Sequence, residues 1–325
     1  MIAIVAGLIS GVGTRVLIPH LRRAGVAATP NERSLHAAPT PHGGGIALVG
    51  AVVAVWLAMV GGGARPVAEL AILAGAVLLA VVSWLDDRYE LSALARLIPQ
   101  VLVVVVSLDL APLDGPVFQG WLPPVLDRAA SGLLWLWFIN LFNFMDGADG
   151  LTGSEAVAIG VGIVLVVLPY SPPMALLGVA VAGAAIGFLV SNWAPAKVFM
   201  GDVGSIPLGY LIGFLLLGLA ASGMWKAALI LPLYFLADAT ITLGRRALRG
   251  EKVWQAHRQH FYQRAVLGGL SHAAMTSRVI AANLALIACA WAAENGYGVV
   301  GLGAACLVVA ILLVVLARAR YTLSP

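Results

Sequence analysis

The sequence is poor in charge. Asp, Glu, Lys and Arg make up 10% of its 325 residues, against about 25% in an ordinary soluble domain. Apolar residues make up 61%, and the mean hydropathy is +0.97. So little polar surface cannot cover a water-soluble fold, and we therefore expect a membrane protein whose apolar residues face lipid.

Other features are scarce as well. The only cysteines, Cys289 and Cys306, lie inside apolar runs, so neither a disulfide framework nor a thiolate metal site is indicated. No repeat of 20–50 residues and no long linker interrupts the chain, which predicts one membrane domain over residues 1–325. The apolar N-terminus lacks a basic leader region, and we interpret it as a retained span.

About 20 apolar residues are needed to cross a bilayer as a helix. Eleven segments fit this length and predict an all-α, polytopic transmembrane bundle. They are Ile2–Ile18, Gly44–Gly62, Val67–Leu85, Leu97–Leu113, Gly132–Phe144, Gly153–Pro169, Met174–Trp193, Ile206–Ser222, Ala227–Leu243, Val279–Ala293 and Val299–Ala317.

Basic residues predict the orientation of this bundle, because cytoplasmic loops hold an excess of Lys and Arg. The odd-numbered loops and the C-terminal tail contain fifteen of the nineteen Lys and Arg residues. We therefore expect a periplasmic N-terminus, a cytoplasmic C-terminus and cytoplasmic loops near 19–43, 86–96, 145–152, 194–205 and 244–278. The net charge of +4 is therefore explained by the basic residues of the cytoplasmic loops. No nucleic-acid partner is expected.

Polar residues that could do chemistry collect in these same loops. Asp86 and Asp87 end the third span, where two adjacent carboxylates are costly unless water, a cation or a basic group compensates them. One could bind a metal while the other handles a proton or the substrate. The alternative is a solvated helix end with Arg88 as partner.

The segment NLFNFMDGADGLTG carries a polar stripe. Asn140, Asn143, Asp146 and Asp149 are each three residues apart, a spacing that keeps side chains on one helical face. We predict a ligand site here, against the alternatives of a calcium-type acidic turn or an Asp/Gly turn without a ligand.

Asp202 stands between two glycines in FMGDVGS, a tight turn that displays one carboxylate. Mg²⁺ prefers oxygen ligands and is usually bound by one or two carboxylates plus water and substrate phosphates. Asp202 with another of these aspartates would suit that ion, although a capped turn would also explain the pattern.

The loop RRALRGEKVWQAHRQHFYQRA is basic. His257 and His260 are three residues apart and have Arg258 between them, a set that could neutralise and hydrogen-bond a pyrophosphate. A basic loop held to anionic lipid headgroups is the alternative. Zinc is less favoured, because no thiolate or third histidine is adjacent.

Two further features remain open. The first loop, NERSLHAAPTPHGGG, contains His36 and His42 and could form a lid over a substrate or an ordinary turn. Asp238 lies within an apolar span, which makes it a functional candidate, unless it pairs with Arg245 or Arg246.

These elements, in this order and over nearly the whole chain, resemble the polyprenyl-phosphate N-acetylhexosamine-1-phosphate transferases (glycosyltransferase family 4). This family includes phospho-N-acetylmuramoyl-pentapeptide transferase and the enzymes that start O-antigen and common-antigen synthesis. The resemblance is carried by HAAPTPHGGG, Asp86-Asp87, NLFNFMDGADGL, FMGDVGS and the terminal histidine loop. That loop reads HRQHFYQR where many members have contiguous histidines, which resembles the surface-polysaccharide branch and leaves the sugar open.

The resemblance implies roles for the site residues. It implies that Asp202 binds Mg²⁺ (or Mn²⁺), that Asp86 and Asp87 are the essential pair, and that the Asn140–Asp149 stretch binds the metal-diphosphate and the nucleotide. We assign Asp149 to both the catalytic and the metal-binding group. Substrate binding falls to Asn140, Asn143, Asp146, His257, Arg258, His260 and His36.

The expected reaction is transfer of a sugar 1-phosphate from a UDP-N-acetylated sugar to undecaprenyl phosphate, with release of UMP, at the cytoplasmic face of a bacterial inner membrane. Phosphoryl transfer needs mainly positioning and charge neutralisation, which such residues provide. A homodimer is left open. The rival hypothesis is a transporter or flippase for an anionic or lipid-linked substrate, which predicts polar groups across the membrane depth.

Overall fold

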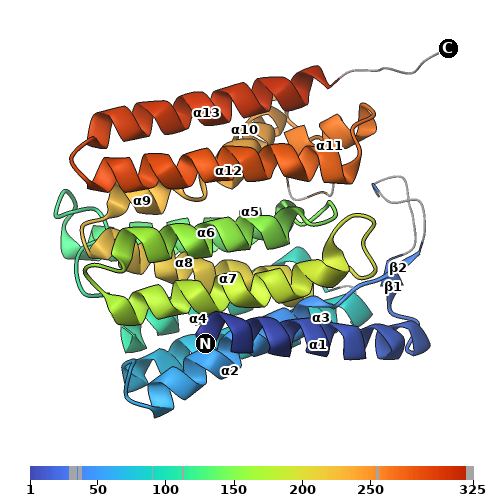
Figure 1. Ribbon diagram of the computed structural model, residues 1–325, viewed down its shortest axis with the longest axis horizontal. Coiled ribbons are helices and arrows are strands. Elements are labelled where there is room, and N and C mark those ends of the chain that lie inside the picture. Colours follow the sequence, from blue (N-terminus) through green and yellow to red (C-terminus); the bar gives the residue numbers. More distant parts are fainter. Residues whose placement is uncertain are drawn as a thin grey trace.

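The computed structural model describes the chain except for residues 29–34, 36–38, 90, 112, 254, 256 and 320–325. It is a bundle of roughly parallel helices (Figure 1). The first helices are α1 (Ile2–Arg23), α2 (Gly45–Gly61), α3 (Leu70–Tyr89, preceded by the 3-10 turn Val67–Glu69), α4 (Ala93–Leu110), α5 (Pro124–Phe144), α6 (Leu151–Val167) and α7 (Pro172–Asn192). They are followed by α8 (Asp202–Ala221), α9 (Trp225–Ile230), α10 (Leu233–Leu248), α11 (Phe261–Leu267), α12 (His272–Glu294) and α13 (Gly298–Arg318).

The described part of the chain is therefore helical, as expected, apart from one short hairpin. Two-residue strands, β1 (Ala27–Ala28) and β2 (Thr40–Pro41), pair antiparallel at the end of α1. Among the described residues, eight helices are long and apolar enough to span a membrane, while α2 and α6 are apolar but shorter. An all-α polytopic membrane fold is thus confirmed, whereas eleven spans and the orientation of the termini stay predictions.

One expected span is not a single helix. The predicted segment Ala227–Leu243 is divided into α9 and α10 at Leu231 and Pro232. Proline has no backbone N–H to continue a helix and its ring crowds the preceding turn, so the chain breaks there. The fifth helix also begins earlier than predicted, at Pro124.

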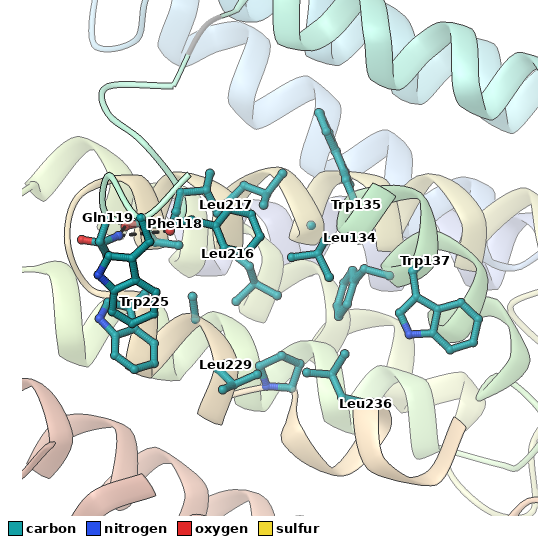
Figure 2. Close-up of a pocket in the computed structure, with 17 residues that line it drawn as sticks. Phe118, Gln119, Leu134, Trp135, Trp137, Leu216, Leu217, Trp225, Leu229 and Leu236 are labelled. Carbon is teal, nitrogen blue, oxygen red and sulfur yellow. Dashed lines mark hydrogen bonds between the residues drawn. The ribbon is translucent and has the colours of Figure 1, made fainter. Parts of the chain in front are cut away.

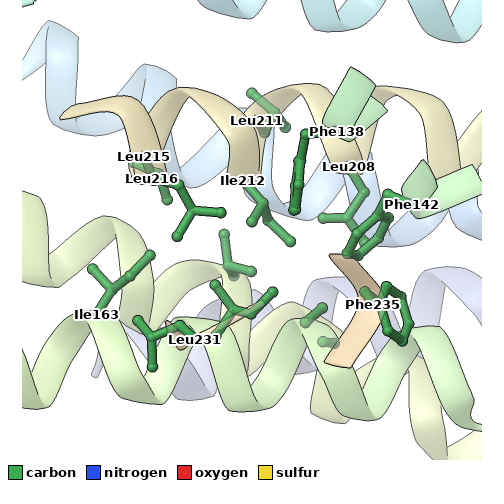
Figure 3. Packing of buried hydrophobic residues seen from close by; sticks show 14 of the residues in the cluster. Phe138, Phe142, Ile163, Leu208, Leu211, Ile212, Leu215, Leu216, Leu231 and Phe235 are labelled. Carbon is green, nitrogen blue, oxygen red and sulfur yellow. The ribbon is translucent and has the colours of Figure 1, made fainter. Parts of the chain in front are cut away.

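Helix α8 forms the centre of the bundle and is almost wholly buried. It packs against α5 and α3, and its leucines and isoleucines meet Phe138 and Phe142 from α5, Ile163 from α6 and Phe235 from α10 (Figure 3). A helix that is apolar on all sides belongs in such a core. Its first residue, Asp202, is thereby held in place at one end of the bundle.

Helices α1 and α7 approach each other closely through glycines. A Cβ atom built on Gly183 would lie 2.4 Å from the backbone oxygen of Ala3, and one on Gly187 would lie 2.1 Å from that of Gly7. Pairs of glycines four residues apart let membrane helices pack backbone against backbone. This contact fixes α1 beside α7, and the hairpin continues from α1 toward the polar end of the bundle.

Candidate active site

The polar residues singled out in the sequence lie at one end of the bundle, where α3, α5 and α10 end and α4, α6 and α8 begin. Figure 1 shows this end on the side of the hairpin and α11. His36 falls outside the described residues. The other candidates can be placed individually.

Asp86 joins the end of α3 to the start of α4. Its carboxylate accepts a hydrogen bond from the backbone N–H of Leu91 at 2.8 Å and lies 3.3 Å from Nη1 of Arg96. Arg88, its partner in the alternative interpretation, instead lies over the ring of Trp84 at 5.3 Å. Asp86 is therefore compensated by a side chain from the next helix.

Asp87 lies on the other side of the same helix end and meets the first loop. Its Oδ2 is 3.6 Å from Nδ1 of His42, which follows β2 and bridges to Phe199. Burial lowers the pKa of His42, and the negative charge of Asp202 opposes this shift. The paired aspartates thus face different partners, Arg96 and His42, and Asp202 is close enough to affect His42.

Asn143 and Asp202 come together. Nδ2 of Asn143 donates to Oδ1 of Asp202 at 2.8 Å and to Oγ of Ser205 at 2.9 Å. Asp202 reaches this position because Gly201 before it has φ 73°, a left-handed conformation that glycine adopts without strain. The structure therefore joins two motifs of the sequence in one site.

A polar pocket of about 750 Å³ surrounds this contact. It is lined by Ala93, Arg96, Leu97, Gln100, Asn140, Asn143, Phe144, Asp202, Ile206, Leu243, Val253, Gln255, His257, His260 and Gln263. Five predicted residues thus line one cavity: Asn140, Asn143, Asp202, His257 and His260.

Arg96 and Gln100 are pocket residues that the sequence reasoning missed as functional candidates. Gln100 is buried and accepts a hydrogen bond from Nδ2 of Asn140 at 2.8 Å. The two residues are four apart on α4, so they share one face. The signal that could have found them is Arg96 directly before the apolar span and Gln100 one turn inside it.

Asp149, predicted as a catalytic and metal-binding residue, is not among the residues that line the polar pocket. Its Oδ2 accepts from the backbone N–H of Ala196 at 3.0 Å, and its own N–H donates to Nδ1 of His272 at 3.1 Å. Its carbonyl accepts from Thr276. In this structure the hydrogen bonds of Asp149 connect the loop before α6 to α12 and to the loop before α8.

Asp146 lies closer to the carboxylates. Burial raises its pKa to about 8, and the charge of Asp202 adds to the shift, while a hydrogen bond with Thr152 opposes it. Asp146 is therefore near enough to Asp202 for the two carboxylates to interact, although it is not among the residues that line the polar pocket.

The histidine loop is shaped by a buried arginine. Arg246 donates from Nε to Glu251 at 2.8 Å and from its terminal nitrogens to the carbonyls of Lys252, Val253 and Gln255. This wraps the loop so that His257 and His260 line the pocket. Arg258, expected to bind the diphosphate, is exposed and does not line it. Asp238 pairs with His260 at 3.1 Å, not with Arg245 or Arg246.

The donor set fits a magnesium ion. Among the residues that the structure describes, no group of three or more His, Cys, Asp or Glu side chains could hold a metal by itself. Mg²⁺, however, commonly takes one or two carboxylates and completes its shell with water and substrate phosphates. Asp202 offers one such carboxylate, and the mutual repulsion of Asp146 and Asp202 is what a divalent cation would relieve.

A second, apolar pocket of about 270 Å³ lies farther along the same helices (Figure 2). Its wall includes Leu134, Trp137 and Phe138 from α5, Leu216 from α8 and Leu236 from α10. The polar pocket is lined by residues of the same three helices nearer that end of the bundle, namely Asn140, Ile206 and Leu243. An amphiphilic ligand could use both.

Comparison with known proteins agrees with the resemblance seen in the motifs. Residues 69–220 match the model of glycosyl transferase family 4. The chain is 32% identical over 292 residues to a probable undecaprenyl-phosphate N-acetylglucosaminyl 1-phosphate transferase of Bacillus subtilis, covering 83% of this chain and 78% of that protein.

Two further relatives extend the comparison. A decaprenyl-phosphate N-acetylglucosaminephosphotransferase of Mycobacterium tuberculosis is 29% identical, over 84% of this chain and 76% of its own. A phospho-N-acetylmuramoyl-pentapeptide-transferase of Picosynechococcus is 29% identical, over 73% of this chain and 69% of its own.

Proposed function

The chain belongs to glycosyl transferase family 4, and from this membership and the polar pocket we propose that it transfers an N-acetylhexosamine 1-phosphate from a UDP-sugar to undecaprenyl phosphate and releases UMP. The observation that carries the proposal is the meeting of Asn143, Asp202, Arg96 and two histidines in one pocket at the end of an apolar bundle. Two of the similar proteins are N-acetylglucosamine phosphate transferases by name, so UDP-N-acetylglucosamine is the first donor to test.

The pocket residues supply what phosphoryl transfer requires, namely positioned groups and compensating charge. Mg²⁺ at Asp202, when bound, would neutralise the diphosphate oxygens and favour departure of UMP. Asn143 holds Asp202 through its Nδ2 and so orients the carboxylate. Arg96 adds a cation at the pocket wall that can bind phosphate oxygens.

Asp86 and Asp87 are assigned to the acceptor phosphate, as base or as orienting groups. Asp86 lies 3.3 Å from Arg96, so the carboxylate fixes an arginine that reaches the pocket. Asp87 is 3.6 Å from His42. In this arrangement Asp86 and Asp87 would approach the acceptor phosphate from the side of the pocket formed by the end of α3 and the start of α4.

The lipid chain is assigned to the apolar pocket of Figure 2. The apolar pocket and the polar pocket are both lined by α5, α8 and α10. The indole of Trp137 on α5 donates to Thr240 on α10 at 3.3 Å, which links these two helices between the two pockets. A polyprenyl chain would lie along these helices while its phosphate enters the polar pocket. The excess of Lys and Arg in the loops at this end favours the cytoplasmic face.

A panel of nucleotide sugars tests the proposal. Purified protein is incubated with undecaprenyl phosphate, Mg²⁺ and UDP-N-acetylglucosamine, UDP-N-acetylgalactosamine, UDP-N-acetylmuramoyl-pentapeptide or UDP-glucose, and UMP and lipid product are measured. We expect turnover with at least one N-acetylated donor. Folded protein that turns over none of them would contradict the proposal and favour transport of a lipid-linked substrate.

A further inference from the structure

Two amide side chains, Gln100 and Asn140, are joined by a hydrogen bond in the wall of the polar pocket. Nδ2 of Asn140 donates to the backbone carbonyl of Leu136 and to Oε1 of Gln100, both at 2.8 Å. A carbonyl oxygen only accepts hydrogen bonds, so the atom that faces Leu136 must be the nitrogen of Asn140. This nitrogen in turn requires an oxygen opposite it, which fixes the orientation of the Gln100 amide.

These contacts leave one half of each amide free. Both hydrogens on Nδ2 of Asn140 are used, so its Oδ1 remains as an acceptor, while the NH₂ group of Gln100 remains as a donor. Among the described residues no hydrogen bond reaches either atom, and neither is one of the atoms sealed in the interior without a partner. Because both residues line the polar pocket, its wall offers a ligand one donor and one acceptor from adjoining side chains.

The amide pair lies deeper in the bundle than the groups assigned to the phosphates. Gln100 follows Arg96 by one turn of α4, and Asn140 precedes Asn143 by one turn of α5. Since α4 begins and α5 ends at the polar end, both steps lead away from that end, by about 5–6 Å along the helix axes. A ligand group that reaches the pair while a diphosphate lies at the polar end is therefore only a few covalent bonds from that diphosphate.

Apolar side chains line the pocket at the same depth. Ile206 follows Asp202 by one turn of α8 and lines the polar pocket. Ile206 and Gln100 also border one small adjoining cavity, which places them close to each other. Leu97, from the same turn of α4, lines the polar pocket as well. The wall thus combines the amide pair with apolar surface, which suits a ligand group that contains both an amide and a methyl group.

We propose that Gln100 and Asn140 determine substrate specificity by binding the 2-acetamido group of the donor sugar. The C=O of this group accepts from Nε2 of Gln100, its N–H donates to Oδ1 of Asn140, and its methyl group packs against Ile206. In a nucleotide sugar the acetamido group stands on the carbon next to the one that carries the diphosphate, in agreement with the depth of the pair. The inference rests on the proposed function and adds the residues that select an N-acetylated donor.

The uracil ring of the same donor also carries an N–H beside a C=O. It lacks the methyl group, and the ribose and the second phosphate separate it from the phosphate that is transferred, so the acetamido group fits the amide pair and Ile206 better. Two ligands distinguish these sources. UMP contains uracil without a sugar, and UDP-glucose contains uracil and a hydroxyl in place of the acetamido group.

Equilibrium binding to the purified full-length protein, in detergent with Mg²⁺, tests the inference with UDP-N-acetylglucosamine, UDP-glucose and UMP as probes. Gln100→Met keeps the length of the side chain but removes its donor. We expect the affinity for UDP-N-acetylglucosamine to fall about ten- to a hundredfold, since the acetamido C=O is left buried without a partner. The affinities for UDP-glucose and UMP should stay unchanged. An equal fall for all three probes would indicate contact with uracil or a structural role and would overturn the inference.

A variant of the neighbouring asparagine separates the two depths of the pocket. Asn143→Ser removes the amide that holds Asp202, so the affinities for UDP-N-acetylglucosamine and UDP-glucose should fall by the same factor. In Gln100→Met, by contrast, the ratio of the two affinities should change. Exchanging the acetamido group for a hydroxyl should then cost less in this variant than in the parent, because the same contact cannot be lost twice. Additive losses would contradict direct contact.

A change in the ligand tests Asn140 without any change in the protein. UDP-2-O-acetylglucose keeps the C=O and the methyl group but has an ester oxygen in place of the N–H. It should bind the parent protein about tenfold more weakly than UDP-N-acetylglucosamine, since Oδ1 of Asn140 loses its donor. Equal affinities would overturn the assignment of Asn140.

The inference and the proposed function can fail separately. A protein that binds the N-acetylated donor with the expected preference but forms no lipid product would count against the proposed function alone. A protein that transfers the sugar 1-phosphate, while Gln100→Met keeps the donor preference of the parent, would overturn the inference alone.

Discussion

Nδ2 of Asn143 lies 2.8 Å from Oδ1 of Asp202, although the two residues are 59 positions apart. Asn143 stands near the end of α5 and Asp202 at the first turn of α8. The contact orients the Asp202 carboxylate through a side chain from another sequence motif, so the FMGDVGS motif by itself does not determine that orientation. It also gives the partly buried carboxylate of Asp202 a hydrogen-bond donor from the protein.

Replacing this carboxylate tests its proposed metal role. Asp202→Asn keeps an oxygen that can accept from Asn143, so folding should be preserved. Mg²⁺-dependent release of UMP should fall at least about a hundredfold, since the amide cannot neutralise a cation. Asp109→Asn is the control, because Asp109 is exposed, pairs with Arg128 and does not line the polar pocket. Retained activity in Asp202→Asn would remove Asp202 from the metal role.

The close contact between α1 and α7 predicts a stability effect. In Gly187→Ala the new Cβ would lie 2.1 Å from the backbone oxygen of Gly7, so the helices must separate, at a cost of about 1–3 kcal/mol. Gly50→Ala in α2 meets no atom within 4 Å and should stabilise by about 0.5–1 kcal/mol. Thermal unfolding in detergent measures both. A Gly187→Ala variant as stable as the parent would show that the helices are not packed so closely.

His257 predicts a dependence of stability on pH. Its pKa is lowered from 6.5 to about 4 by burial and by His260 and Arg246, so the unfolded chain binds a proton at higher pH than the folded protein. The resulting stabilisation is complete above about pH 6.5 and is lost as the pH falls toward 4. His257→Gln lacks it, so the melting temperatures of variant and parent should converge between pH 6.5 and 4.5.

The exposed ring of His20 provides the control for that measurement. His20→Gln is the matched histidine variant, because the His20 ring is exposed at the end of α1. If His257→Gln behaved in the same way as His20→Gln, burial of His257 in the loop would be contradicted.

The apolar pocket predicts a dependence on acceptor chain length. Ala228→Phe fills part of the pocket beside Trp225 and Leu229. The Michaelis constant for undecaprenyl phosphate should rise about tenfold or more, since lost burial of even two CH₂ groups costs about 1.6 kcal/mol. A short polyprenyl phosphate that ends before the pocket should be unaffected. Ala74→Phe on the exposed face of α3 is the control, and equal effects on both chain lengths would argue against this route.

Much of the fold could be predicted because hydropathy alone marks membrane helices. The expected helices are present, and the polar motifs do lie at one end. The division of α9 from α10 was missed, although Pro232 was visible in the sequence, because membrane helices often continue through proline. The early start of α5 was missed since Asp127 and Arg128 make its first turns polar.

The site could be predicted only in part, because sequence spacing does not say which loops meet. Asn143 and Asp202 were chosen separately, and the structure brings them together. Asp149 has the same spacing as its neighbours, yet its side chain accepts from the backbone N–H of Ala196, which lies in a loop distant in the sequence. Arg96 was counted as a topology signal, although its guanidinium reaches the pocket.

The most direct measurement of the central claim follows each phosphate of the donor. UDP-N-acetylglucosamine labelled with ³²P in the β-phosphate or in the α-phosphate is incubated with the protein, undecaprenyl phosphate and Mg²⁺, and the products are separated into lipid and aqueous phases. Transfer of a sugar 1-phosphate predicts that the β label enters the lipid and the α label remains in water-soluble UMP. Recovery of both labels in UDP, or of neither label in any product, would contradict it.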